Sequence, residues 1–371
     1  MAKCLLCGKI SSTISSSIGF CIECIRAKPD DVIPIIMQKH ADARMTYNLP
    51  PKPPRGMGLR CTICANECVL GDGELGFCGL RHNVKGRLVS LSTPERAPLH
   101  YYLDPHVTNC CAAWFCPAGT GSGYPKYACR NGPEYEYYNL AIFFYGCNFD
   151  CLFCQNWNHK EISTSSQVTA EELLSVTLKN DRITCWCFFG GSPEPHLPFA
   201  INASRKVLES IKDRRVMRIC FEWNGCGNEY LVKRCGELAF ISGGNIKFDL
   251  KTFDPTLSLV LSGVKNDSAY ENFSMLFNEF YIERKEVPIL TATTLLVPGY
   301  VDEKEVEGIA KFISEHDENI PYSLLIFHPD YMMRDLTITP ASQVKKCVAV
   351  AKRYLKNVNI GNLHLLSIAP P

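Results

Sequence analysis

Six short apolar segments recur in the second half of the chain, and each is followed by a stretch with helical periodicity. The segments are LAIFFYG (140–146), TCWCFF (184–189), RICFEW (218–223), NIKFDL (245–250), PILTATTLLV (288–297) and YSLLIF (322–327). Such segments, apolar on both faces, are typical of strands buried in a parallel sheet. Helix-start signals lie between them: capping boxes at Thr169 with Glu172 and at Asp302 with Glu305, and a first-turn proline at Pro340.

The regular alternation of strand and helix predicts an α/β fold with a parallel sheet. Six units are fewer than the eight that close a full barrel. We therefore expect residues 139–371 to form a partial (β/α)6 barrel and a C-terminal segment. Its chemistry should lie at the carboxyl ends of the strands, and its open side should be available to a macromolecular substrate.

The first 138 residues differ in composition and are rich in cysteine, glycine and proline. We expect residues 1–58 to form a zinc-knuckle-like segment that ends in the linker PPKPPRGMG (50–58). Residues 59–138 should form a cysteine-rich module with a metal-binding loop at 110–129. The chain has 21 cysteines, and fifteen of them lie at or before Cys154 in short groups without an export signal. This pattern favours metal ligation over disulfides, and the six later cysteines are expected to be small core residues.

Three cysteine quartets precede the predicted barrel. They are Cys4, Cys7, Cys21 and Cys24, then Cys61, Cys64, Cys68 and Cys78, and then Cys110, Cys111, Cys116 and Cys129. The first has the spacing of two zinc knuckles that close on one tetrahedral ion. The second is a candidate for a further metal. The third suits rubredoxin-like iron or zinc equally well, and a buried, metal-free patch is the alternative.

Charge and hydropathy exclude some partners. Lys+Arg (39) nearly balance Asp+Glu (38), so the chain has no large net positive charge that would attract nucleic acid or an acidic membrane surface. No apolar run reaches the roughly 18–20 residues of a membrane span, and the N-terminal sequence MAKCLLCGKISS lacks the apolar core of a signal peptide. We expect a cytoplasmic protein.

The segment YGCNFDCLFCQNW carries the strongest chemical signal. It places Cys147, Cys151 and Cys154 in a C-x3-C-x2-C pattern directly after the first predicted strand. Three thiolates can hold a [4Fe-4S] cluster and leave one iron without a protein ligand. That iron can chelate the amino and carboxylate groups of S-adenosylmethionine (SAM). A zinc site or a storage cluster is the alternative, although either normally needs a fourth ligand at fixed spacing.

This motif is that of the radical SAM superfamily, and the chain resembles its members strand by strand over residues 139–371. The resemblance implies that SAM is cleaved reductively to methionine and a 5′-deoxyadenosyl radical. It also implies that SAM and a neighbouring cation are bound by Phe153, Gly190, Gly191, Ser192, Glu194, Glu222, Asn224, Asp249, Lys251 and His328.

The segments EWNG and KFDLK are similar to those of glycyl-radical-enzyme activating enzymes. There, residues matching Glu222 and Asp249 hold a monovalent cation, and the lysine matching Lys251 touches the SAM carboxylate. Surface ion pairs at strand ends are the alternative for Glu222, Lys251 and His328.

The N-terminal half extends the resemblance. CTICANECVLGDGELGFCGLR is similar to the cysteine module of uncharacterised radical SAM proteins related to those activating enzymes. The inserted loop 110–129 and the N-terminal knuckles together resemble the methanogenesis marker protein 10 family of methanogenic archaea. That family implies a radical SAM methyltransferase that methylates an arginine Cδ in the alpha subunit of methyl-coenzyme M reductase. It also implies cobalamin as the methyl carrier, an iron in the loop, and an electron donor such as a ferredoxin.

Cobalamin rests on the resemblance alone. The chain has no separate Rossmann-like cobalamin domain and no D-x-H-x-x-G motif, so cobalamin would need a non-standard pocket between the N-terminal module and the open side or C-terminal strands of the barrel. The implied reaction uses SAM twice, as a radical source and as a methyl source, because an arginine Cδ–H is too weakly acidic for a general base. Two alternatives stay open: a glycyl-radical-enzyme activating enzyme, and a zinc-dependent binding module on a barrel scaffold.

Overall fold

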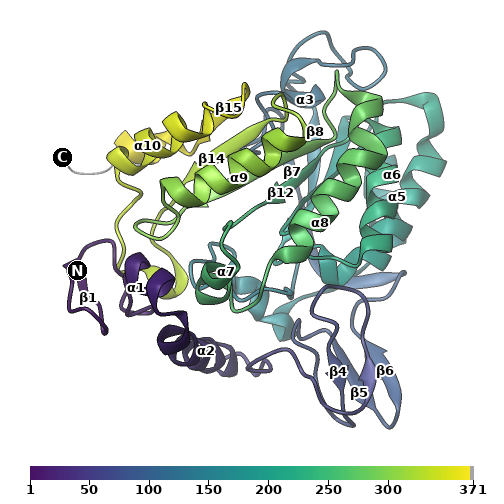
Figure 1. The fold of residues 1–371 in the computed structure, drawn as a ribbon. Helices are drawn as coiled ribbons and strands as arrows, with labels where there is room; N and C mark the ends of the chain where they lie inside the picture. The colour runs from purple at the N-terminus through teal and green to yellow at the C-terminus, as the bar shows by residue number, and fades with distance from the viewer. Residues whose placement is uncertain (368–371) are drawn as a thin grey trace.

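A nine-stranded sheet forms the centre of the computed structural model, which describes residues 1–367 (Figure 1). Its strand order is β15-β14-β13-β12-β11-β10-β8-β7-β9. Seven of the strands are parallel: β8 (Tyr138–Phe144), β10 (Ile183–Gly190), β11 (Arg218–Trp223), β12 (Ile246–Asp249), β13 (Leu290–Leu296), β14 (Tyr322–Ile326) and β15 (Val358–Gly361). All six predicted strands are present, and the expected partial α/β barrel is confirmed.

Three strands of this sheet were not predicted. Strand β7 (Arg96–Pro105) pairs antiparallel with β8, and the short β9 (Gln167–Thr169) pairs antiparallel with β7. Half of the residues of β7 are exposed and it contains Pro98 and Pro105, so it lacks the continuous apolar pattern of the inner strands. The sheet therefore begins within the range that we expected to form the cysteine-rich module. Strand β15 is a half-buried edge strand of four residues, too short to give a clear pattern.

Helices connect the parallel strands and cover the outside of the sheet (Figure 1). They are α4 (Ala170–Leu178), α5 (Leu197–Ile211), α6 (Glu229–Ser242), α7 (Pro255–Ser262), α8 (Asp267–Leu276), α9 (Glu303–His316) and α10 (Ala341–Ala351). None of the helices in residues 1–367 is both long enough and apolar enough to cross a bilayer.

The predicted helix starts are mostly correct. The hydroxyl of Thr169 accepts the Glu172 N–H at 3.1 Å, and Asp302 accepts the N–H groups of Lys304 and Glu305. The Glu305 carboxylate, however, turns to another loop instead of closing its capping box. Pro340 is the N-cap of α10, one residue before the predicted position.

The alternation of side chains along the strands divides the molecule into an apolar outer core and a polar interior. In β10, Trp186 and Phe188 are fully buried toward the helices, and Phe188 stacks on Phe221 of β11 at 5.3 Å between ring centroids. The residues between them, Cys185 and Cys187, point to the other face of the sheet because successive side chains alternate. That face lines the barrel interior.

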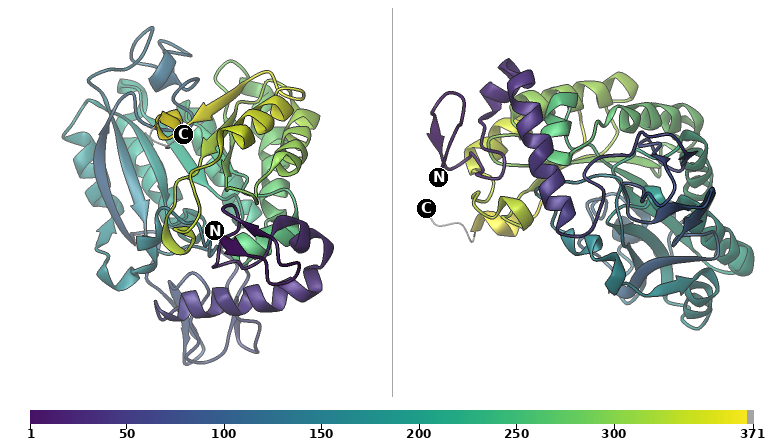
Figure 2. Two further views of the ribbon diagram at one scale, coloured as in Figure 1. Left: turned by 90° about the vertical axis from the view of Figure 1, so that its left-hand side faces the viewer. Right: turned by 90° about the horizontal axis from the view of Figure 1, so that it is seen from below.

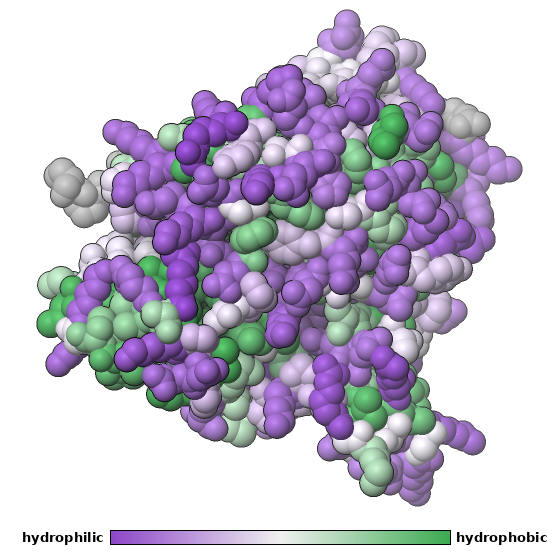
Figure 3. All heavy atoms as spheres, in the orientation of Figure 1, coloured by the Kyte–Doolittle hydropathy of each residue, from purple (hydrophilic) through white to green (hydrophobic). Residues whose placement is uncertain are grey.

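The N-terminal residues lie at one end of the barrel. A small hairpin, β1 (Ala2–Lys3) and β2 (Ile10–Ser11), precedes α1 (Ile22–Ala27) and the long helix α2 (Pro29–Met45). Seen from below in Figure 2, α2 crosses this end of the molecule, and it contacts α7. The surface includes apolar side chains at the lower left of Figure 3. Within the N-terminal segment, Leu5 and Ile10 are exposed.

Two further pieces complete the fold. The short hairpins β3 (Leu59–Arg60) with β4 (Val69–Leu70) and β5 (Arg81–Val84) with β6 (Arg87–Ser90) form a small module beside the barrel. The cysteine-rich loop that contains α3 (Pro117–Thr120) lies at the opposite end of the barrel from α2 (Figure 1).

Candidate functional site

The loop after β8 brings the three predicted cluster cysteines to one cavity. Cys147 and Cys151 are buried and Cys154 is half-buried, and all three line a cavity of about 180 Å³, called the cluster cavity below. No fourth cysteine of the described residues lines it. Three thiols that share a cavity fit a [4Fe-4S] cluster with one open iron. Burial raises the pKa of Cys154 to about 12, so cluster binding must displace thiol protons.

A buried carboxylate braces this loop from inside. Asp150 is fully buried, pairs with Lys160, and accepts from His40 at 2.8 Å, while Arg44 lies at 3.5 Å. Burial would raise the pKa of Asp150, but Lys160, His40 and Arg44 outweigh it and hold that pKa below its ordinary value. Because His40 and Arg44 belong to α2, the N-terminal helix supports the cluster loop directly. The sequence analysis missed this contact.

The glycine pair after β10 forms one wall of the cluster cavity. Gly190 has a φ of +112°, which favours glycine. A Cβ on Gly191 would overlap the carbonyl oxygen of Gly146 and approach the His159 ring at 2.8 Å. The backbone here lies so close to the cluster loop that only glycine fits. These two glycines stand where the resemblance places the SAM amino group.

Asn224 ties the walls of the cavity together. Its side-chain N–H donates to Ser192 Oγ at 2.7 Å and to Asn148 Oδ1 at 2.8 Å. Asn148 belongs to the cluster loop and Ser192 follows the glycine pair, so one amide fixes two strand ends against each other. Phe153, Ser192 and Asn224 line the cavity as expected from the resemblance.

Glu194 is a correction to the expected SAM contacts. It is fully buried and does not line the cluster cavity; its carboxylate accepts the Gly225 N–H at 2.6 Å and bonds to Ser192. Burial raises the pKa of Glu194 to about 7. The reason is local: residues 194–196 form a short 3-10 turn that directs this side chain under the end of β11. Glu194 is therefore a positioning residue.

Each expected cation ligand is paired with a lysine. Asp249 forms an ion pair with Lys251, and Glu222 lies 3.2 Å from Lys247. Burial would lower the pKa of Lys251, but the Asp249 carboxylate outweighs it and raises that pKa above its ordinary value. Glu222, Asp249 and Lys251 all line the cluster cavity, and Lys251 stays charged to meet an anionic group there.

Two histidines differ in their position relative to the cluster cavity. His328 does not line the cluster cavity, and within residues 1–367 its ring nitrogen Nδ1 lies 3.4 Å from the neighbouring Pro329 carbonyl oxygen. His159, which the sequence analysis did not select, lines the cavity. It is buried, and its Nδ1 has no hydrogen-bond partner among residues 1–367. No signal in the sequence distinguishes it, because it lies in a turn five residues after Cys154.

A second cavity of about 370 Å³, called the barrel cavity below, occupies the interior next to the first. Both cavities are lined by Asn156, Phe189 and Glu222. The barrel cavity is rich in thiols, which come from Cys110, Cys116, Cys185, Cys187 and Cys220. Three of these are among the six later cysteines expected in the core: Cys185 and Cys187 are buried as expected, Cys220 is half-buried, and all three face the cavity.

One lysine organises the thiols of the barrel cavity. Lys247 donates to the Sγ atoms of Cys110 and Cys187, both at 3.1 Å. A hydrogen bond from Cys111, helped by Lys247 and opposed by burial, lowers the pKa of Cys110 to about 7. The cavity thus holds a buried cation beside a thiol that ionises near neutral pH.

The cysteine loop is not assembled as the predicted iron site. Cys110 and Cys111 group with Glu222, with ligand atoms within 4.8 Å of one another, and no such group in residues 1–367 includes Cys116 or Cys129. Cys129 lines a different cavity, because its N–H bonds to Glu134 at 2.8 Å, away from Cys110.

A buried ion pair fastens this loop to the amino-terminal ends of the strands. Arg218, the first residue of β11, makes two hydrogen bonds of 2.8 and 2.6 Å to Glu134, and both residues are almost fully buried. Trp114 donates to Ser323 at the start of β14, at 3.1 Å. The loop therefore closes the end of the barrel opposite the cluster.

The first two quartets differ in compactness. The Sγ atoms of Cys4, Cys7, Cys21 and Cys24 all lie within 4.8 Å of one another. Cys61, Cys64, Cys68 and Cys78 are buried in the small module, but no three of them form so tight a group in the described chain. The module contacts the cluster loop, since Asn66 donates to the Asn148 carbonyl at 2.7 Å.

Comparisons with known proteins agree with this site. Residues 141–313 match the model of the radical SAM superfamily. In Methanocaldococcus jannaschii, "Uncharacterized protein MJ0808" is 24% identical over 329 residues, 82% of this chain and 81% of its own. "Putative glycyl-radical enzyme activating enzyme MJ1632" of the same organism is 25% identical over 225 residues, 59% of this chain and 79% of its own.

Among solved structures, Streptococcus suis SuiB bound to S-adenosylmethionine is 14% identical with a TM-score of 0.43, over 62% of this chain and 48% of SuiB. A domain of pyruvate-formate lyase-activating enzyme from Bacteroides vulgatus is 17% identical with a TM-score of 0.39, over 47% of this chain and 98% of that domain. The family match covers every residue that lines the cluster cavity except Leu325 of β14. Residues 141–313, slightly under half of the chain, are therefore similar to the radical SAM superfamily.

Proposed function

We propose that the chain is a radical SAM methyltransferase that adds a methyl group to the side-chain Cδ of an arginine in a protein. By resemblance, the substrate is the alpha subunit of methyl-coenzyme M reductase and the reductant is a ferredoxin. The observation that supports the proposal most is the barrel cavity, which adjoins the cluster cavity and shares three lining residues with it. A side chain in the barrel cavity lies next to the place where the radical forms.

The chain's own residues would hold the cluster and SAM and would shield the radical from water. Cys147, Cys151 and Cys154 would hold the [4Fe-4S] cluster, which, when bound, supplies the electron that cleaves SAM. Gly190 and Gly191 leave room for SAM against the loop, and the Lys251 ammonium suits its carboxylate. The apolar walls of Phe153 and Trp223 exclude water from the same cavity.

The barrel cavity has groups that suit a guanidinium. Asp104 and Glu222 both line it, and carboxylates are the strongest partners of arginine. Burial raises the pKa of Asp104, and Asp104 forms no ion pair within residues 1–367, so it is available to a cationic side chain. Glu222 also forms an ion pair with Lys247, and it would orient the guanidinium from the side of the cluster cavity.

The described residues do not form a pocket fitted to cobalamin beside the cluster. The barrel cavity, at about 370 Å³, is at the small end of the roughly 300–1,000 Å³ that drug-sized ligands occupy. A corrin is larger than such a ligand. We therefore derive no reaction step through cobalamin, which enters the proposal by resemblance alone.

The test is a methyl-transfer assay with anaerobically reconstituted protein. The mixture contains an arginine peptide of the proposed substrate, SAM labelled in its methyl group, cobalamin and a strong reductant. We expect 5′-deoxyadenosine, S-adenosylhomocysteine and a peptide that carries the label on an arginine carbon. Cys151→Ala should give no labelled peptide, whereas Cys347→Ala, which removes a buried thiol far from the site on α10, should retain it.

A second function is favoured by one relative. The "Putative glycyl-radical enzyme activating enzyme MJ1632" of Methanocaldococcus jannaschii is 25% identical to this chain over 225 residues. An activating enzyme would abstract one hydrogen and transfer no methyl group. If the assay gives 5′-deoxyadenosine without label in any peptide or protein substrate, this second function replaces the first.

A further inference from the structure

The N-terminal hairpin has almost no apolar core of its own. Of residues 1–11, only Cys4 is buried, while Leu5, Leu6 and Ile10 point into solvent. An isolated two-stranded hairpin is marginally stable at best in water, and segments this small usually need a metal or a disulfide. The hairpin is nevertheless closed and fixed against α1.

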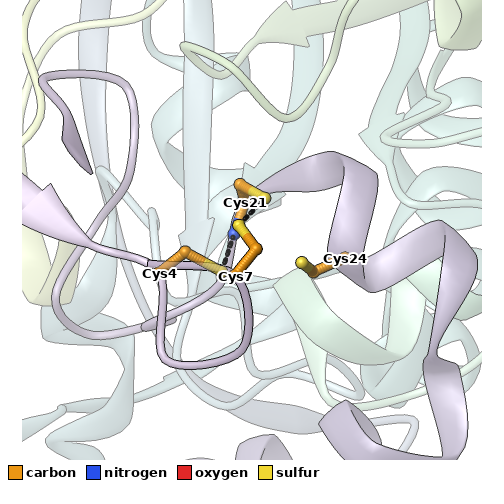
Figure 4. Close-up of side chains that lie close together, drawn as sticks. All are labelled: Cys4, Cys7, Cys21 and Cys24. Carbon is orange, nitrogen blue, oxygen red and sulfur yellow. Dashed lines mark hydrogen bonds between the residues drawn. The ribbon is translucent and has the colours of Figure 1, made fainter. Parts of the chain in front are cut away.

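The four cysteines of this segment supply what the apolar contacts do not (Figure 4). Their Sγ atoms all lie within 4.8 Å of one another, and the Sγ atoms of Cys7 and Cys21 are 3.7 Å apart. A tetrahedral ion with Zn–S bonds of about 2.3 Å places its sulfur ligands about 3.8 Å apart. The Cys7–Cys21 distance therefore matches a four-sulfur zinc site, and the other Sγ–Sγ distances exceed that spacing by about 1 Å at most.

The backbone around the first pair is shaped for metal binding. Cys4 and Cys7 lie in the turn of the hairpin, where the Cys4 N–H bonds to the Lys9 carbonyl at 2.7 Å and the Gly8 N–H to the Cys4 carbonyl at 3.0 Å. Gly8 has a φ of +75°, which lets the turn close. This arrangement turns both thiols to one side.

The second pair comes from the start of a helix. Cys21 is the N-cap of α1 and Cys24 lies in its first turn. The Cys21 N–H also points to the Cys4 Sγ at 3.5 Å, as drawn in Figure 4. A hairpin turn and a helix start thus contribute two thiols each, and together they surround one point.

The loop between the two pairs reaches the cluster site through two contacts. The Ser15 hydroxyl donates to the Asp335 carboxylate at 2.9 Å, and Ser16 donates to it through its backbone N–H at 2.6 Å and its hydroxyl at 2.8 Å. Three residues before Asp335, the Met332 N–H donates to the Leu152 carbonyl at 3.1 Å. Leu152 lies between the cluster cysteines Cys151 and Cys154. The N-terminal loop therefore holds residues 331–335 against the cluster loop.

We propose that Cys4, Cys7, Cys21 and Cys24 bind one structural zinc ion, which closes the loop 7–21 into a clamp over residues 331–335 and so protects the [4Fe-4S] cluster. Zinc suits this role because structural sites use four closed protein ligands and leave no open position. The site lies apart from the cluster cavity and does not depend on the methyl-transfer reaction.

The first test is metal content of the full chain with its cluster in place. Wild-type protein should contain about one zinc per chain, with four sulfurs at about 2.3 Å by X-ray absorption. The Cys7→Ser/Cys24→Ser variant should lose that zinc, and the matched control Cys235→Ser/Cys347→Ser should keep it. Zinc that is unchanged in the first variant, or iron in place of zinc at these four sulfurs, would overturn the assignment.

The second test separates the clamp from the metal. Asp335→Asn removes the negative charge that accepts the hydrogen bonds of Ser15 and Ser16 but leaves the four thiols intact. This variant should keep its zinc and yet release cluster iron to a chelator several-fold faster than wild type, as should the Cys7→Ser/Cys24→Ser variant. Iron release at the wild-type rate in Asp335→Asn would overturn the clamp.

If the cysteine variant does not fold, wild-type protein supplies the same answer. Removing zinc from it with a chelator should raise hydrogen exchange in residues 1–24 while the barrel strands stay protected. Equal protection of residues 1–24 before and after zinc removal would overturn the proposal.

Discussion

Replacing Glu134 by glutamine tests how the cysteine loop is held at the closed end of the barrel. Glu134 is fully buried, accepts two hydrogen bonds from Arg218, and accepts one each from Thr184 at 2.9 Å and from the Cys129 N–H at 2.8 Å. Burial would raise the pKa of Glu134, but Arg218 outweighs it and holds that pKa below its ordinary value. Glu134→Gln leaves the Arg218 charge buried without an anion.

The size of the effect follows from that burial. Removing one partner of a buried ion pair costs about 3–5 kcal/mol. We expect the free energy that protects residues 110–137 to fall by that amount, which corresponds to about two to four orders of magnitude in an opening equilibrium. Native-state hydrogen exchange, read by mass spectrometry over this loop, measures it directly.

Two controls make the result interpretable. Glu209→Gln breaks an exposed pair with Arg205 and should cost less than about 1 kcal/mol. Combining Glu134→Leu with Arg218→Met removes both charges and should recover most of the loss, since apolar replacements of a buried pair are often neutral. If Glu134→Gln itself changes loop protection by less than about 1 kcal/mol, the ion pair does not fasten the loop.

Three more predictions concern residues in and behind the walls of the cluster cavity. Glu194→Gln should abolish a pH dependence of the free energy of unfolding. Because the folded-state pKa of Glu194 is raised to about 7, its protonation contributes about 3 kcal/mol of stability below about pH 4.5, at 1.36 kcal/mol per pKa unit, and this contribution is lost as the pH rises through about 7. Urea unfolding at several pH values should show this slope only in wild type. Gly191→Ala should weaken SAM binding by about tenfold or more without loss of iron, because its Cβ overlaps Gly146; equilibrium dialysis with labelled SAM measures this, and wild-type affinity would contradict it. Lys251→Met should raise the KM for SAM more than it lowers kcat, since Lys251 is assigned to the carboxylate of bound SAM; an unchanged KM would remove that role.

The sequence predicted the barrel well because its strands are buried on both sides. Continuous apolar segments such as 184–189 and 218–223 are a strong signal, and both are strands in the structure. Strand β7 was missed for the opposite reason: it lies toward the edge of the sheet, is exposed at half of its residues and contains two prolines. Nothing in such a segment requires a strand until β8 is present to pair with it.

The parts of the site that local sequence spacing determines were predicted. The parts that depend on contacts between distant segments were missed. The C-x3-C-x2-C motif and the glycine pair determine their own geometry, and both face one cavity. His159 and the support of Asp150 by α2 depend on contacts between distant segments. Cys185 and Cys187 were interpreted as core because TCWCFF is apolar throughout. Strand alternation, which sends them inward between Trp186 and Phe188, was the overlooked signal.

The central claim is that the triad-bound cluster cleaves SAM, and one measurement tests it most directly. Anaerobically reconstituted wild type, Cys151→Ala and Cys347→Ala are each incubated with SAM and a strong reductant, and 5′-deoxyadenosine is quantified. Wild type and Cys347→Ala should produce it, because Cys347 lies on α10 outside both cavities. Cys151→Ala should produce none, and 5′-deoxyadenosine from Cys151→Ala at the wild-type rate would contradict the account.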